Sequence, residues 1–177
     1  MDLPRVIFVD IDGPMIPGGM YLRSMGASYE RLFASHCVDA LNAFCERTSA
    51  KIVFNSYHNY QTTCDRIGDD FVNNGENLRK AAVRNGIISD HIHTDWRTEY
   101  ASPETRKLSG VTLGRYDAIQ RWLTAHPDTT DWIAIDDADF RAYAGDKQIL
   151  IDFDYGFTIK EMNVALAKFN AKPFLTF

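Results

Sequence analysis

An apolar run near the start of the chain, Val6–Val9, constrains the fold most, and it ends at Asp10, Ile11, Asp12 and Gly13. Such a run, rich in β-branched residues, predicts a strand buried on both faces, as in parallel α/β sheets. Ligands of these sheets bind at the carboxyl ends of the strands. Because side chains alternate along a strand, the two carboxylates lean the same way and repel each other unless a cation or a shared proton intervenes. Asp and Gly are also ordinary turn residues, so the segment alone is equally compatible with a turn.

The size and composition of the chain suit one globular domain, which we expect to span residues 1–177. Of these residues, 45% are hydrophobic and 12% are aromatic, which is enough to bury a sizeable core. No apolar run approaches the roughly 20 residues needed to cross a bilayer, and the start of the chain lacks the features of a secretory signal. We therefore expect a cytoplasmic protein with no membrane partner.

Charge and cysteine content argue against three further classes of protein. A net charge of -5 argues against non-specific binding to nucleic acid, although it is compatible with a local basic patch at a phosphate site. The three cysteines, Cys37, Cys45 and Cys64, form no CxxC pair. They predict neither a disulfide framework nor a zinc knuckle.

Segments of strand type alternate with segments of helical spacing along the whole chain. Strands separated by helices require crossover connections. The alternation therefore predicts an α/β fold, a doubly wound, Rossmann-like parallel sheet of about five strands with helices on both faces. The expected strands are 6–9, 51–56, 87–94, 131–137 and 148–152; the expected helices are 31–47, 60–86 with a break near 73–75, 112–125 and 159–169; and 97–110 is expected to be irregular.

Polar residues stand at the carboxyl ends of the expected strands, where ligands of a parallel sheet bind. Asn55 and Ser56 end the second strand, and Asp136 and Asp137 end the fourth. Arg115 lies near the start of the helix before the fourth strand. The acid pair supplies the opposing half of a cation site for the two carboxylates of the first strand.

This order of residues resembles the haloacid dehalogenase-like (HAD) superfamily of phosphohydrolases. That superfamily has a DxD motif after the first strand, a Ser or Thr after the second, a Lys or Arg at a helix start and a paired acid after the fourth. The corresponding positions are 10–13, Ser56, Arg115, and Asp136 with Asp137. The resemblance extends over nearly the whole chain and implies a Mg²⁺-dependent phosphomonoesterase.

The resemblance also implies a role for each acid. Asp10 would be the nucleophile that forms an aspartyl-phosphate. Asp12 would protonate the leaving oxygen and then take a proton from the attacking water. Asp10, the backbone carbonyl of Asp12, and Asp136 would hold Mg²⁺, and Asp137 would orient water beside it. Which acid of the Asp136–Asp137 pair contacts the metal directly is left open.

Ser56 and Arg115 are the expected catalytic contacts of the substrate phosphate, because a hydroxyl and a planar guanidinium both donate to phosphate oxygens. Asn55 is an alternative phosphate contact, since the register is ambiguous by one residue. Lys107 is an alternative to Arg115, which is favoured because it begins a segment of helical spacing. His58 follows Ser56 closely and could bind a base or sugar of the substrate.

The intervals between the expected strands are too short for a large cap domain. The chain therefore resembles minimally capped HAD members, in particular the small HAD domains associated with RNA-repair proteins. It departs from them at residues 55–59, which lack a Ser-rich run ending in Trp-Arg. A nucleotide, a nucleic-acid end or another phosphorylated metabolite is the expected substrate, and the open site is compatible with closure by a second copy in a homo-oligomer. The alternatives are a sugar-phosphate or phosphoprotein phosphatase and a non-catalytic binding or regulatory module.

Overall fold

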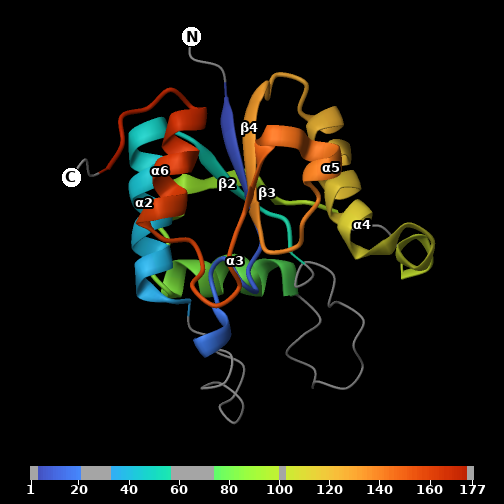
Figure 1. The fold of residues 1–177 in the computed structure, drawn as a ribbon, viewed down its shortest axis with the longest axis horizontal. Coiled ribbons are helices and arrows are strands. Elements are labelled where there is room, and N and C mark those ends of the chain that lie inside the picture. The colour runs from blue at the N-terminus through green and yellow to red at the C-terminus, as the bar shows by residue number, and fades with distance from the viewer. Residues whose placement is uncertain (1–3, 21–32, 57–73, 100–102, 175–177) are drawn as a thin grey trace.

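Five parallel strands form one sheet, as the sequence predicts, in a computed structural model that describes residues 4–20, 33–56, 74–99 and 103–174 (Figure 1). The strand order is β3-β2-β1-β4-β5, and every neighbouring pair is parallel. The central strand β1 is therefore covered by a neighbour on each side, which suits its continuous apolar sequence. The strands are β1 (Arg5–Val9), β2 (Lys51–Phe54), β3 (Ile92–Arg97), β4 (Asp131–Asp136) and β5 (Gln148–Leu150).

The register of the central strands brings their carboxyl ends to one level. Val9, the last residue of β1, pairs with Phe54 of β2 and with Ile135 of β4. The polar residues that follow these strands therefore leave the sheet side by side at a single edge.

Alternate side chains of the central strand enter two separate cores. Ile7 and Val9 belong to the larger core, which contains residues of α2, α3 and α6, whereas Val6 and Phe8 belong to a smaller core with residues of α4 and α5. Figure 1 shows α2 and α6 together on one side of the sheet and α4 and α5 on the other. The sheet is thus doubly wound. The helices are α2 (Ser35–Thr48), α3 (Asn74–Arg84), α4 (Pro103–Ala125), α5 (Arg141–Ala144) and α6 (Ile159–Lys168).

The third strand differs from its predicted bounds of 87–94, because β3 begins at Ile92 and ends at Arg97. Ile87 is apolar because it is buried after the turn that ends α3, and residues 89–91 form a 3₁₀ turn. β3 is an edge strand with exposed positions, so its polar residues do not show the apolar run of a central strand.

The predicted helix 112–125 matches the helical turns after Gly110, but further helical turns precede them. α4 begins at Pro103 within a segment expected to be irregular, and it is interrupted at Gly110, where φ is 75° and ψ is 165°. The glycine adopts this conformation without the steric cost of a Cβ atom. Arg115 consequently lies five residues after a break in the helix and not at its first turn.

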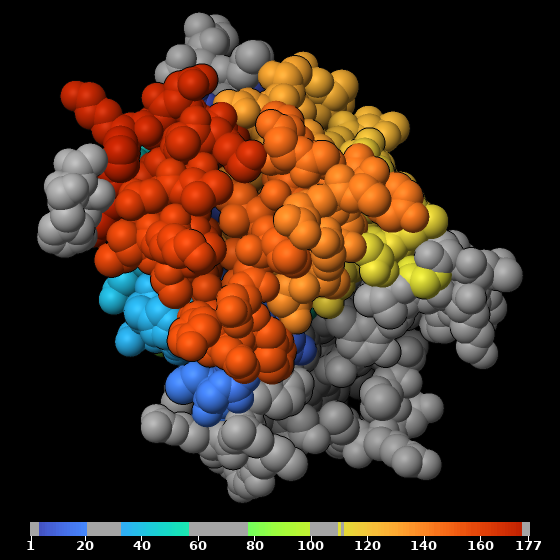
Figure 2. Space-filling view, viewed as in Figure 1, coloured from blue at the N-terminus to red at the C-terminus, as the bar shows by residue number. Residues whose placement is uncertain are grey.

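The other predicted helices and strands agree with the described ones to within a few residues, or lie partly outside the described residues. α2 starts at Ser35 rather than at residue 31, and the predicted helix 60–86 is described only from α3 onward. Figure 2 shows that the chain from β4 to the C-terminus covers much of one face. Among the described helices, none combines the length and apolarity that crossing a membrane requires.

Candidate active site

Backbone hydrogen bonds continue the sheet beyond the last residues of its strands. The Asp10 N–H donates to the carbonyl of Ile135 at 3.1 Å, and the Asn55 N–H donates to the carbonyl of Val9 at 2.8 Å. The carbonyl of Asp136 accepts from the N–H of Ile151 at 2.9 Å. The main chain is thereby held in place where the polar side chains begin.

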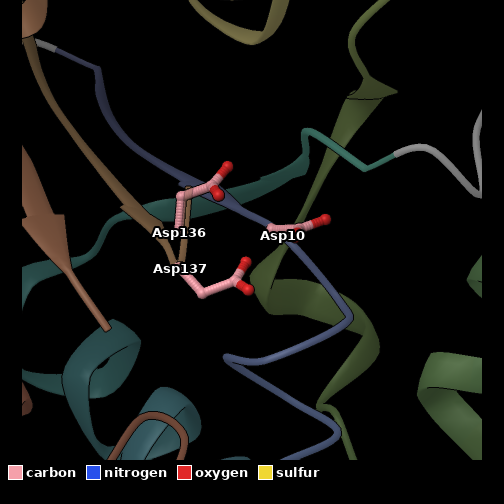
Figure 3. Close-up of side chains that lie close together, drawn as sticks. All are labelled: Asp10, Asp136 and Asp137. Carbon is pink, nitrogen blue, oxygen red and sulfur yellow. The ribbon is translucent and has the colours of Figure 1, made fainter. Parts of the chain in front are cut away.

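Three carboxylates meet at this edge. One oxygen from each of Asp10, Asp136 and Asp137 lies within 4.8 Å of the other two. Figure 3 shows Asp10 at the end of β1 beside the two acids at the end of β4. Asp10 and Asp136 are each 1% exposed, so their charges interact through protein with little screening by water.

The side chain of Arg115, on α4, contacts both Asp10 and Asp136. Its Nη1 atom lies 2.6 Å from Oδ2 of Asp10 and donates a hydrogen bond to Oδ2 of Asp136 at 2.7 Å. The Arg115 side chain is 11% exposed. One guanidinium therefore compensates part of the negative charge that two buried carboxylates would create.

The environment shifts the ionisation of all three acids in one direction. Burial raises the pKa of Asp10, although the Arg115 charge and hydrogen bonds from Arg115 and Ser56 oppose the shift. Burial and the charge of Asp10 raise the pKa of Asp136 well above its ordinary value, and the same two causes raise the pKa of Asp137. The cluster thus holds more negative charge than its surroundings stabilise.

A divalent cation of the Mg²⁺ type fits this arrangement. Carboxylate oxygens are the ligands that Mg²⁺ prefers, and three of them converge here on one position beside a single guanidinium. The set Asp10, Asp136 and Asp137 could hold the ion. The side chain of Asp12 is not in this set, which is compatible with the expectation that Asp12 offers its backbone carbonyl.

The side chain of Asp137 packs closely against the main chain at Gly13, directly after the DxD segment. Gly13 has a φ of +89°, and a Cβ atom there would lie 2.8 Å from Cγ of Asp137. Asp12, one residue earlier, forms an isolated bridge with Ile16, and its charge contributes to the raised pKa of Asp137. A glycine is therefore required both by the backbone conformation and by the packing of the acid.

The two residues after β2 have different surroundings. The hydroxyl of Ser56 forms a hydrogen bond with Asp10 that opposes the rise in the pKa of this acid, whereas the amide of Asn55 contacts Thr98 and the carbonyl of Arg115. These contacts favour Ser56 as the phosphate contact and give Asn55 partners within the protein. Both assignments stay predictions.

Two other predicted residues lie outside what is described. His58 falls in the undescribed segment 57–73, and the side chain of Lys107 is likewise not described. The contacts of Arg115 with the acids are compatible with its predicted role, and Lys107 stays an untested alternative.

Two polar residues support the site without having been singled out in the sequence. Thr98 follows β3 directly, a signal that the predicted bounds of that strand concealed. Gln148 lies on β5, where its Nε2 donates to the carbonyl of Ala138 at 2.7 Å and its Oε1 accepts from the N–H of Phe140 at 2.8 Å. Gln148 thereby holds the loop that follows Asp137, and no local sequence signal marks this contact.

Comparison with known families gives one match. Residues 6–162 match the model of the family described as "HAD domain in Swiss Army Knife RNA repair proteins". The match includes both strand ends that carry the acids, as well as Ser56 and Arg115. No curated protein and no solved structure matches the chain.

Replacement of Gly13 tests the packing around Asp137. We expect Gly13→Ala to lower the free energy of unfolding by about 1–3 kcal/mol and to weaken Mg²⁺ binding, because the new methyl group displaces the acid. Gly145→Ala is the matched control, since Gly145 also has a positive φ, +60°, but no atom lies within 4 Å of the position that an added Cβ would take. Urea denaturation and calorimetric Mg²⁺ titration measure the two effects. Equal results for both variants would refute the close approach.

The pH dependence of metal binding tests the electrostatics of the acids. Their pKa values are raised in the folded state, so folding takes up protons and the metal-free protein loses stability as pH rises from about 4 through those values. Mg²⁺ binds the deprotonated acids, so its stabilising effect grows with pH. We expect saturating Mg²⁺ to raise the melting temperature by about 2–4 °C for each kcal/mol of binding at neutral pH, and by less near pH 5.

Asp146→Asn is the control for this pH experiment, because Asp146 is an exposed acid outside the cluster and its loss leaves the Mg²⁺ response intact. Asp136→Asn removes a predicted ligand and abolishes most of the response. A melting-temperature shift that is independent of pH, or that persists in Asp136→Asn, would contradict the assignment.

Proposed function

The chain belongs to the family of HAD domains in Swiss Army Knife RNA repair proteins, and we propose that it is a Mg²⁺-dependent phosphomonoesterase. Membership of the family supports a HAD-type phosphatase or a related function. The observation that carries the finer proposal is the buried Asp10 carboxylate, held between Arg115 and two further acids at the carboxyl edge of the sheet. One group of residues would then supply a nucleophile in Asp10, a site for a metal ion in the acids, and a positively charged phosphate contact in Arg115.

Mg²⁺ would be held by Asp10, Asp136 and the backbone carbonyl of Asp12, with Asp137 beside it. When bound, the ion neutralises negative charge on the acids and on the substrate phosphate. This compensation matters because attack by an anion on a phosphate dianion is opposed by charge.

In the first step, an Asp10 carboxylate oxygen forms a bond to phosphorus while the bond between phosphorus and the ester oxygen breaks. The Asp12 carboxylic acid gives its proton to the departing oxygen, which leaves as an alcohol. The products are an aspartyl-phosphate on Asp10 and a carboxylate on Asp12.

In the second step, a water oxygen attacks the phosphorus of the aspartyl-phosphate, and the bond to the Asp10 oxygen breaks. Asp12 takes a proton from this water and is again a carboxylic acid. Inorganic phosphate is released and the Asp10 carboxylate is restored, so the enzyme returns to its initial state.

Ser56 and Arg115 act on the phosphate oxygens in both steps. The Ser56 hydroxyl and the Arg115 guanidinium donate hydrogen bonds to the transferring group and so stabilise its negative charge. Arg115 already contacts Asp10 and Asp136, so little reorganisation is required to place it beside a phosphate bound at Asp10. His58 stays a proposed contact of the substrate beyond its phosphate.

A phosphorylated nucleotide or nucleic-acid end is the substrate class that we favour. The family description refers to RNA repair proteins, and repair of RNA ends includes the removal of terminal phosphates as a chemical requirement for some joins. The net charge of -5 argues against non-specific binding along a polyanionic backbone and so supports recognition of the phosphate end.

Hydrolysis of p-nitrophenyl phosphate tests the reaction. We expect activity with Mg²⁺, loss of it with EDTA, and a fall of about 10³-fold or more in kcat for Asp10→Asn, which removes the nucleophile without changing its size. Asp146→Asn, at an exposed acid outside the cluster, retains activity. A panel of nucleotides, RNA 3′- and 5′-phosphates, sugar phosphates and phosphopeptides then ranks the substrates.

Two results of these assays would count against the proposal. Activity that survives both EDTA and Asp10→Asn would exclude the mechanism. Absence of hydrolysis for every compound in the panel, with tight binding of one of them, would instead indicate a non-catalytic module.

A further inference from the structure

The buried side-chain amide of Asn55 links the ends of two strands to helix α4 beside the acids. Asn55, which follows β2, is 1% exposed. Its Oδ1 accepts a hydrogen bond from the Thr98 hydroxyl at 2.7 Å, and its Nδ2 donates to the backbone carbonyl of Arg115 at 3.4 Å. One side chain therefore links the residue after β3 to the helix residue that contacts Asp10.

The hydrogen-bond chemistry allows only one orientation of this amide. A backbone carbonyl accepts but does not donate, so the amide group that faces Arg115 has to be the NH₂ group. The opposite atom is then the amide oxygen, and a hydroxyl can donate to it. The Arg115 carbonyl thereby determines which way the Asn55 amide points, and the Thr98 hydroxyl satisfies the amide oxygen at the other end.

Thr98 is itself held firmly. It is 1% exposed, and its backbone N–H donates to the carbonyl of Phe54 at 3.0 Å, one residue before Asn55. Both the main chain and the side chain of Thr98 thus bond to the end of β2. The donor hydroxyl is positioned by the sheet and not by a loop.

The Asn55 contact lies near a break in the helix that carries Arg115. α4 is interrupted at Gly110, five residues before Arg115. A carbonyl oxygen has two lone pairs and can accept the Asn55 amide in addition to a hydrogen bond within the helix. The Asn55 contact lies on the main chain of Arg115, whose side chain reaches Asp10 and Asp136.

We propose that Thr98 and Asn55 are positioning residues of the active site, which hold the main chain of Arg115 so that its guanidinium reaches the nucleophile Asp10. The proposal rests on the proposed function for its catalytic consequence. Its structural content, that the Thr98 hydroxyl controls the Arg115 guanidinium through Asn55, is independent of turnover.

Thr98→Val is the central variant, because it replaces the hydroxyl with a methyl group of similar size. We expect a fall of about 10-fold in kcat/KM for p-nitrophenyl phosphate, as for other partners that orient a functional group. Thr98→Ser keeps the hydroxyl and stays within about twofold of the parent protein. Asn55→Asp places an oxygen against the Arg115 carbonyl and loses at least as much activity as Thr98→Val.

Thr48→Val is the matched control for loss of a buried hydroxyl. Thr48 is 2% exposed, and its hydroxyl donates to the carbonyl of Phe44 at 2.8 Å at the end of α2, before β2 begins. This variant loses stability comparable to that of Thr98→Val while kcat/KM is retained. If Thr48→Val and Thr98→Val lower kcat/KM equally, the role of Thr98 is merely structural.

A double-mutant cycle separates positioning from general damage. If Thr98 acts through Arg115, Thr98→Val causes no further loss of kcat/KM in an Arg115→Gln background, whereas independent effects multiply. The side-chain Nε–Hε NMR signal of Arg115, assigned by its absence in Arg115→Gln, provides a readout without turnover. We expect Thr98→Val to shift or broaden this signal and Thr48→Val to leave it unchanged.

The two readouts distinguish the failure of this inference from failure of the proposed function. A parent protein that hydrolyses no phosphomonoester would refute the function, and the NMR signal would still decide whether Thr98 controls Arg115. An unchanged Arg115 signal in Thr98→Val, or multiplicative losses in the double variant, would overturn the inference.

Discussion

Among the described residues, the site depends on the balance of charge between three clustered carboxylates and one guanidinium. Asp10, Asp136 and Asp137 lie within 4.8 Å of one another, and Arg115 contacts the first two. Buried charges are costly unless they are paired, and one guanidinium pairs incompletely with three carboxylates, so the pKa of each acid is raised. The site therefore favours a proton or a cation, and under the proposed function a phosphate beside Asp10 would need the cation.

The arrangement of the backbone brings these charged side chains close together. Parallel pairing brings the ends of β1, β2 and β4 to one level, and hydrogen bonds from Asp10 and Asn55 continue the sheet past the strands. Gly13 leaves room for Asp137, and Gln148 forms hydrogen bonds with the main chain of the loop that follows Asp137. Hydrogen bonds of the described main chain keep repelling carboxylates together, as the proposed phosphoryl transfer would need.

Local sequence predicted the features that local physics determines. The apolar run ending in Asp10 indicated a central strand with an acidic end, and the order of polar strand ends indicated which residues would meet. The predicted bounds of the third strand were wrong by several residues, because the buried turn residue Ile87 is as apolar as a strand residue. As a result, Thr98 was not identified as the residue that follows the strand. The role of Gln148 depends on a contact between separate elements, which no local pattern encodes.

Chemical trapping of the reaction tests most directly whether this arrangement makes Asp10 a nucleophile. The protein would be quenched in acid during turnover of p-nitrophenyl phosphate with Mg²⁺, reduced with borohydride, which converts a phosphorylated aspartate to homoserine, and digested for mass spectrometry. The arrangement predicts homoserine at position 10. Homoserine at another aspartate, or continued turnover with Asp10 unmodified at every quench time, would contradict it.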